Sequence, residues 1–134
     1  MSNVQMIIYD GWLVDKPELR FTPTGSAVAN FRMGSSQIYR DKNGEQKKVT
    51  TWLKVAVWGA NAERIAKHCQ KGTRVQVHGR LRPNPETGSP EIFTLKTGEA
   101  AASYEINARD VFIISGGVFE NRNEEEDDNG GLPY

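Results

Sequence analysis

The sequence predicts an all-β domain, a small five-stranded barrel with one helix, followed by an acidic tail. Two observations carry the fold prediction. Five short runs of alternating or β-branched residues are separated by turns that contain Pro and Gly. One segment with helical spacing lies between the third and the fourth run. A change in composition then divides the chain into a domain over residues 1–115 and a tail over residues 116–134.

The predicted strands follow the period-two pattern of half-buried β-structure. They cover Gln5–Val14, Ala27–Tyr39, Val49–Trp58, Thr73–Leu81 and Tyr104–Ile114. Ala60–Gln70 places small and apolar residues at helical spacing, and Gly72 follows as a stop signal. This order of elements is that of an OB-fold barrel. A small β-sandwich that carries one helix is the alternative.

The formal net charge of zero is an average over two oppositely charged parts. Residues 1–115 contain 16 Lys and Arg against 11 Asp and Glu, which gives +5. Residues 116–134 contain one Arg against six acids, which gives −5, with five consecutive acids at Glu124–Asp128. A basic body of this kind suits a polyanionic ligand. The tail has too few apolar residues to form a core, so we expect it to be disordered.

The third predicted strand carries large aromatic side chains on the face that does not enter the core. Alternate residues are aliphatic and of a size that suits a core: Leu53, Val55 and Val57. The opposite face carries two indoles around a cation: Trp52, Lys54, Ala56 and Trp58. Exposed indoles call for a ligand or partner that covers them, and a subunit interface is the alternative cover.

Basic residues extend this outward face onto the neighbouring strands and loops. The candidate binding residues on the strands beside the third are Arg32, Tyr39, Arg40, Arg80 and Arg82. On the fourth strand, alternation places Leu81 on the inward face, so we expect it in the core. Two loops add Lys47 and Lys48 at a polar hairpin tip and Phe93 in a Pro- and Gly-rich connection. Aromatic rings stack unpaired bases while cations follow the phosphates. We therefore expect single-stranded DNA as the ligand, with RNA left open because stacking does not distinguish the sugar.

The sequence argues against catalysis, metals, cofactors and membranes. His68 and Cys69 are adjacent on the predicted helix, so their side chains diverge and cannot form a nucleophile–base pair. The lone cysteine can form no internal disulfide or cysteine-based metal site. No apolar run approaches the length of a membrane span, and the amino terminus lacks a secretory pattern. We expect a cytoplasmic protein that is not an enzyme.

Six segments of the body occur in the order and spacing of one known family: Asp15–Arg20, Gly25–Asn30, Tyr39–Lys42, Thr51–Gly59, Ala62–Ala66 and Lys71–Arg82. They resemble the bacterial and organellar single-stranded DNA-binding proteins, which are homotetrameric OB-folds. The resemblance implies that Tyr39, Trp52 and Trp58 stack bases, that Lys54 lies near phosphates, and that the chain forms a homotetramer. The departures from the pattern include Leu53, which replaces a histidine linked to subunit contacts, Trp12, which replaces a small polar residue, and Asp10 in an otherwise apolar first strand.

The tail also resembles that family, in which an acidic segment ends in an apolar pair of Pro and an aromatic residue. We expect it to bind replication, recombination and repair proteins through Asp127, Asp128, Leu132, Pro133 and Tyr134. The alternative function is that of an OB-fold protein–protein adaptor or a primosome-like accessory factor, whose aromatics lie in a protein interface. Titration with oligo-dT distinguishes the two, because an adaptor should show no quenching of tryptophan fluorescence.

Overall fold

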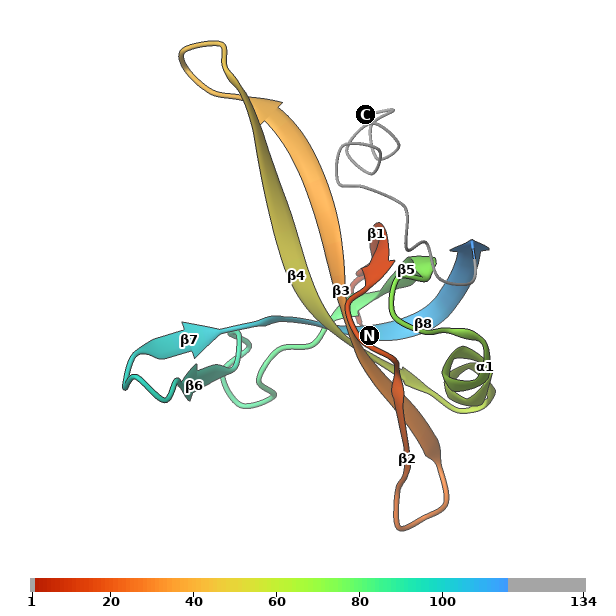
Figure 1. Ribbon diagram of the computed structural model, residues 1–134. Helices are drawn as coiled ribbons and strands as arrows, with labels where there is room; N and C mark the ends of the chain where they lie inside the picture. Colours follow the sequence, from red (N-terminus) through yellow and green to blue (C-terminus); the bar gives the residue numbers. More distant parts are fainter. Residues whose placement is uncertain (1, 116–134) are drawn as a thin grey trace.

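The structure, a computed structural model, describes residues 2–115, which form eight strands and one helix (Figure 1). In chain order these are β1 Ile7–Leu13, β2 Glu18–Phe21, β3 Ala27–Arg40, β4 Gln46–Trp58, α1 Ala60–His68, β5 Arg74–Leu81, β6 Ile92–Thr94, β7 Ala100–Ala102 and β8 Tyr104–Ser115. The predicted tail lies outside the described residues, and so do its candidate partner-binding residues Asp127, Asp128, Leu132, Pro133 and Tyr134.

Five strands close into a barrel because β1 pairs along both of its edges. It runs antiparallel to β5 from Ile7 to Trp12 and meets β3 at Trp12 and Leu13. The ring continues through antiparallel β3–β4, parallel β4–β8 and antiparallel β8–β5 pairing. A sandwich would leave its two sheets unjoined at this point, so closure confirms the predicted OB-fold barrel.

The core follows the alternation of the strands and includes one face of α1. The predicted inward side chains of β4 are buried, as are those of β3 from Ala27 to Met33. The helix begins after Gly59, whose φ of 73° suits glycine, and it buries Ala62 and Ile65. Arg64 Nη2 donates a hydrogen bond of 2.6 Å to the carbonyl of Val111 and so ties α1 to β8.

Two burial predictions are wrong, each for a local reason. Ala56 was expected outward but is only 6% exposed, because its methyl group lies between Asn30 of β3 and Asn107 of β8 in one row of the sheet. Leu81 was expected in the core but is 59% exposed. It is the last residue of β5, beyond an irregularity at His78 and Gly79, and it lines the open end of the barrel with Tyr104.

Three short strands were not predicted. β2 pairs with β3 through the tight turn that contains Gly25, and β6 pairs with β7 to form a separate two-stranded arm. The β3–β4 hairpin is also longer than expected, since β4 begins at Gln46. In Figure 1 this hairpin and the β6–β7 arm project away from the barrel on different sides. These projections border the outward face of β4.

Gly79 allows β5 to approach β8 closely, and this contact gives a test of the fold. A Cβ atom at Gly79 would lie 2.2 Å from the carbonyl oxygen of Asn107 and 2.9 Å from Ala108 Cα. We expect Gly79→Ala to lower the free energy of unfolding by about 1–3 kcal/mol, measured by urea denaturation. Lys67→Ala, on the exposed face of α1, is the control and should change stability by less than about 0.5 kcal/mol. Equal stability of the two variants would contradict the close approach.

Candidate nucleic-acid interface

The outward face of β4 carries an exposed series of side chains, called here the aromatic strip: Trp52, Lys54, Ala56 and Trp58. Trp52 is 58% exposed and Trp58 is 50% exposed. Six residues of extended chain place the two indoles about 20 Å apart. Ala56, which lies between them, is buried and has a small side chain. The strip therefore has an indole at each end, with the cation of Lys54 and a shallow depression at Ala56 between the indoles.

Ion pairs surround the centre of the strip. Across the ladder from Lys54, Arg32 of β3 donates to Asp15 Oδ2, at 2.6 Å from Nη2 and 3.0 Å from Nε. On the other side, Arg82 Nη1 lies 3.7 Å from Glu105 Oε1. These side chains line a groove of about 430 Å³ whose floor includes Ala56. Because the Arg32–Asp15 pair is exposed on both sides, it contributes only about 0–1 kcal/mol, and a phosphate can replace its carboxylate at little cost.

The β6–β7 arm brings Phe93 to the strip. The Nζ atom of Lys54 lies 5.1 Å from the centre of the Phe93 ring, a cation–π contact. The sequence placed Phe93 in a loop, whereas the structure places it in β6, paired with Ala101. The arm therefore adds a third ring beside the cation that the two indoles flank.

Arg80 lies at the far edge of the same outward face. It pairs with Asn107 of β8, which in turn pairs with Ala56. Each strand in this row presents the residue to the same side of the sheet, so Arg80 extends the groove toward β5. The structure thus brings together seven of the predicted binding residues: Trp52, Lys54, Trp58, Arg32, Arg82, Arg80 and Phe93.

Two aromatic side chains that the sequence analysis does not assign to the site border the strip. Phe21, the last residue of β2, is exposed and shares a hollow of about 470 Å³ with Trp58. Trp12 of β1 contacts Trp52. The signal for Phe21 was an aromatic residue directly before the Thr22–Gly25 turn, which was read only as a turn. The signal for Trp12 was its departure from the family pattern.

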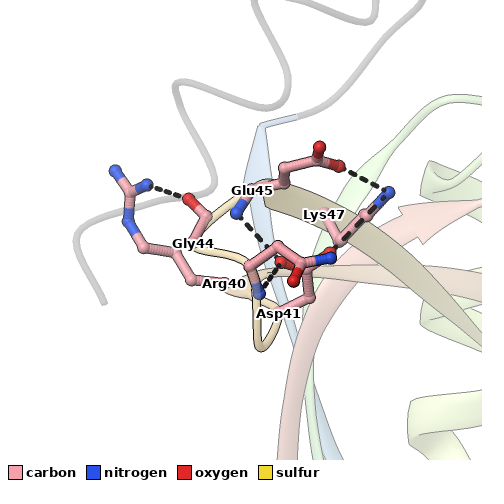
Figure 2. A network of polar contacts seen from close by, with 6 residues as sticks. Arg40, Asp41, Gly44, Glu45 and Lys47 are labelled. Carbon is pink, nitrogen blue, oxygen red and sulfur yellow. Dashed lines mark hydrogen bonds and ion pairs between the residues drawn. The ribbon is translucent and has the colours of Figure 1, made fainter.

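The tip of the β3–β4 hairpin is tied by its own side chains (Figure 2). Asp41 Oδ1 accepts hydrogen bonds of 2.9 Å from the backbone N–H groups of Asn43 and Glu45. Arg40 donates to the carbonyl of Gly44 at 2.8 Å, and Lys47 Nζ lies 3.3 Å from Glu45 Oε2. Part of the positive charge that the sequence assigned to this tip is therefore engaged within the hairpin.

The register of the hairpin separates Tyr39 from the aromatic strip. Tyr39 pairs with Lys47 and Gly34 pairs with Trp52, in a ladder that runs without a bulge. Alternation then places Tyr39 and Lys47 on the opposite face from Trp52, while Arg40 and Lys48 share the face of the strip. Tyr39 and Lys47 therefore lie on the other face of the hairpin from the strip, and their assignment to the binding site stays a prediction. Tyr39 is nevertheless exposed, because the hairpin projects beyond the barrel.

The groups that could support catalysis or a metal are poorly placed. Cys69 is buried, and burial raises the pKa of its thiol above the ordinary value, against a smaller lowering effect of Arg64. The thiol therefore stays protonated at neutral pH and is a weak nucleophile. Within residues 2–115 no three side chains of His, Cys, Asp or Glu are grouped to hold a metal ion. In the same range, no helix has the length and apolar character needed to cross a membrane.

The closed barrel defines an OB-fold, and an exposed aromatic and cationic face is typical of OB-folds that take single strands. Residues 4–114 match the family described as "Single-strand binding protein family", and the chain belongs to that family.

Individual relatives agree with this membership. A single-stranded DNA-binding protein of Paenarthrobacter aurescens is 44% identical over 84 residues, which are 61% of this chain and 49% of that protein. The chain therefore spans about half the length of this relative.

Solved structures share the fold at lower identity. The "Plasmodium falciparum SSB complex with ssDNA" has a TM-score of 0.69 and 23% identity over 86% of this chain and 98% of the other. A small single-stranded DNA-binding protein of Streptomyces coelicolor has a TM-score of 0.66 and 21% identity over 84% and 95% of the two chains.

Proposed function

We propose that this protein binds single-stranded DNA without strong sequence preference and protects it. The observation that carries the proposal is the aromatic strip, in which two half-exposed indoles flank Lys54 on one sheet face. Every base has a π-face that can stack on an indole, so this geometry does not depend on sequence. The proposal places the protein in the cytoplasm and assigns it no enzymatic activity.

The charges of the groove suggest how the strand is held. Stacked bases on Trp52 and Trp58 leave the phosphates near the centre of the strip, where Lys54, Arg32 and Arg82 lie. Binding then exchanges Asp15 and Glu105 for phosphates as partners of the two guanidiniums, whereas the cation of Lys54 lies over the Phe93 ring. The affinity therefore combines stacking with charge.

The stacking half of the proposal is tested by removing each indole. We expect Trp52→Ala and Trp58→Ala each to weaken binding of oligo-dT by about 1–3 kcal/mol, with smaller losses for Phe at either position. Fluorescence anisotropy of labelled oligo-dT measures the affinity. Tyr104→Ala is the matched control, since Tyr104 is an exposed aromatic at the barrel end and outside the strip. If the protein is instead an adaptor whose aromatic residues lie in a protein interface, the unmodified chain should not bind oligo-dT.

The electrostatic half is tested by salt. On single strands the logarithm of the affinity should fall against the logarithm of the salt concentration by about 0.7 for each phosphate contact. Lys54→Ala and Arg80→Ala should each flatten that slope by about one contact, whereas Lys67→Ala on α1 should leave it unchanged. An affinity that does not respond to salt would remove the phosphate contacts from the proposal.

We further propose that the chain assembles with copies of itself, as a homotetramer. The outer face of β1, β5 and β8 exposes the large apolar side chains of Ile8, Phe112 and Ile114, which contact with a second copy would cover. Leu53 is only 2% exposed and belongs to the core, so it cannot make the subunit contacts that the resemblance assigns to a histidine at this position. Molar mass in solution at several concentrations distinguishes a tetramer from a monomer.

The acidic tail is proposed to compete with DNA and to recruit replication and repair proteins. Its acids at Glu124–Asp128 are linked to a body with a net charge of +5. A short linker keeps their effective concentration near the basic face at about the millimolar level. DNA that occupies the face displaces the tail and makes Leu132 and Tyr134 available to a partner with an apolar pocket and a basic rim.

Two deletions test the tail. Removal of residues 120–134 should tighten binding to oligo-dT at low salt and change it little at high salt, where charges are screened. Removal of residues 132–134 alone should leave DNA binding unaltered and abolish capture of replication or repair proteins. Capture of the same proteins by this shorter deletion would show that the apolar tip is not their binding site.

A further inference from the structure

Trp12 and Arg74 lie in line with Trp52 on the outside of the barrel. The register aligns Arg74 of β5 with Trp12 of β1, Trp12 with Gly34 of β3, and Gly34 with Trp52 of β4. These four residues, called here the indole row, cross four adjacent strands. The row meets the aromatic strip at Trp52 and leads away from it toward β5.

Gly34 allows the two indoles of the row to meet. A Cβ atom at Gly34 would lie 2.6 Å from Trp12 Cζ2 and 2.9 Å from Trp52 Cζ3, so both rings occupy the space above the glycine. The ring centres are 6.2 Å apart and the planes are at 83°, an edge-to-face contact. Any other residue at this position would separate the rings. The glycine therefore acts through the space it leaves free.

Trp12 is held on both sides while Trp52 stays open. The guanidinium of Arg74 lies over the Trp12 ring, 5.8 Å from its centre, and Trp52 contacts Trp12 from the other direction. Trp12 is half-buried, whereas more than half of Trp52 is exposed. A ring that is already fixed loses less rotamer freedom when it binds a ligand, which favours affinity. Trp12 thus fixes the ring that is exposed for stacking.

Charge favours this direction across the barrel. Arg74 supplies a cation beyond Trp12, on the path of a strand that leaves Trp52 toward β5. The following outward pair of β1 and β5 is Asp10 and Gln76, in which Gln76 Nε2 donates to Asp10 Oδ1 at 2.8 Å. This pair lies beside the row, two residues along both strands, and the carboxylate of Asp10 repels phosphate. A strand that crosses β1 is therefore favoured at Trp12 and Arg74 over the position of Asp10.

We propose that the indole row is a nucleotide subsite, and this rests on the proposed function. One base stacks on Trp52, Trp12 is the positioning residue that holds the Trp52 ring, and Arg74 binds a phosphate farther along the strand. The single strand therefore leaves the aromatic strip at Trp52 across β1 toward β5. It does not continue along the β3–β4 hairpin toward Lys48.

The subsite is tested with oligo-dT and the full chain. Trp12→Ala should weaken binding about 3- to 10-fold, the range of an edge-to-face aromatic contact, and Trp12→Phe should recover most of the loss. In a Trp52→Ala background, Trp12→Ala should add almost nothing, because a positioning residue acts through the ring that it holds. Arg74→Ala should reduce the salt slope by about 0.7, whereas the control Lys67→Ala on α1 should not change it.

Several results would overturn the subsite. Wild-type affinity in a folded Trp12→Ala, or in Trp12→Leu if the alanine variant does not fold, removes the positioning role. An equal loss from Trp12→Ala with and without Trp52 shows that Trp12 acts independently. An unchanged slope for Arg74→Ala removes the phosphate contact. A change of molar mass in Trp12→Ala without loss of affinity per chain assigns the row to an interface between copies.

The failure of the subsite can be separated from failure of the proposed function. Loss of affinity in Trp58→Ala together with normal binding by Trp12→Ala and Arg74→Ala overturns the indole row alone. The absence of oligo-dT binding by the unmodified chain overturns both.

Discussion

The structure depends on the double pairing of β1. This strand leaves β5 and joins β3 at Trp12 and Leu13, and the passage is so close that a Cβ atom on Gly11 would lie 2.1 Å from the carbonyl oxygen of Gly34. Closure at this point requires mutually consistent registers in the five strands of the ring. Because side chains alternate, a slip of one residue in β4 would turn its tryptophans into the core and its valines into solvent. The position of the aromatic strip is thus a consequence of closure.

The acidic residues beside the aromatic strip orient arginine side chains, a role that the net charge does not reveal. Asp15 and Glu105 reduce the net charge of the body, yet each lies against an arginine at the edge of the groove. Such pairs hold the guanidiniums toward the groove in the absence of a ligand, and they are weak enough to be exchanged. Lys54, whose cation lies over Phe93, has an aromatic contact in place of a carboxylate. The groove can therefore offer cations to a phosphate backbone although several acids surround it.

The sequence predicted the barrel, the helix and the aromatic strip because each depends on local periodicity and on residue type. β2 was missed because four residues give too short a pattern, and β7 because its three alanines carry little preference for a strand. Leu81 and Ala56 were misplaced because burial at the end of a barrel, or under neighbouring side chains, depends on the tertiary arrangement. The face of Tyr39 could not be predicted because it depends on the register of a long hairpin. Trp12 and Trp52 meet only because barrel closure brings β1 beside β3.

The β3–β4 hairpin has a mechanical consequence. Its ladder continues unbroken from Val28 and Trp58 in the barrel to Arg40 and Gln46 at the tip, and Asp41 ties the turn. The hairpin therefore continues the hydrogen-bonded ladder of the barrel wall and is anchored by it at its base. Its strand β4 also carries both indoles of the aromatic strip. A contact that bends the hairpin would therefore act on the same strand where the bases would stack.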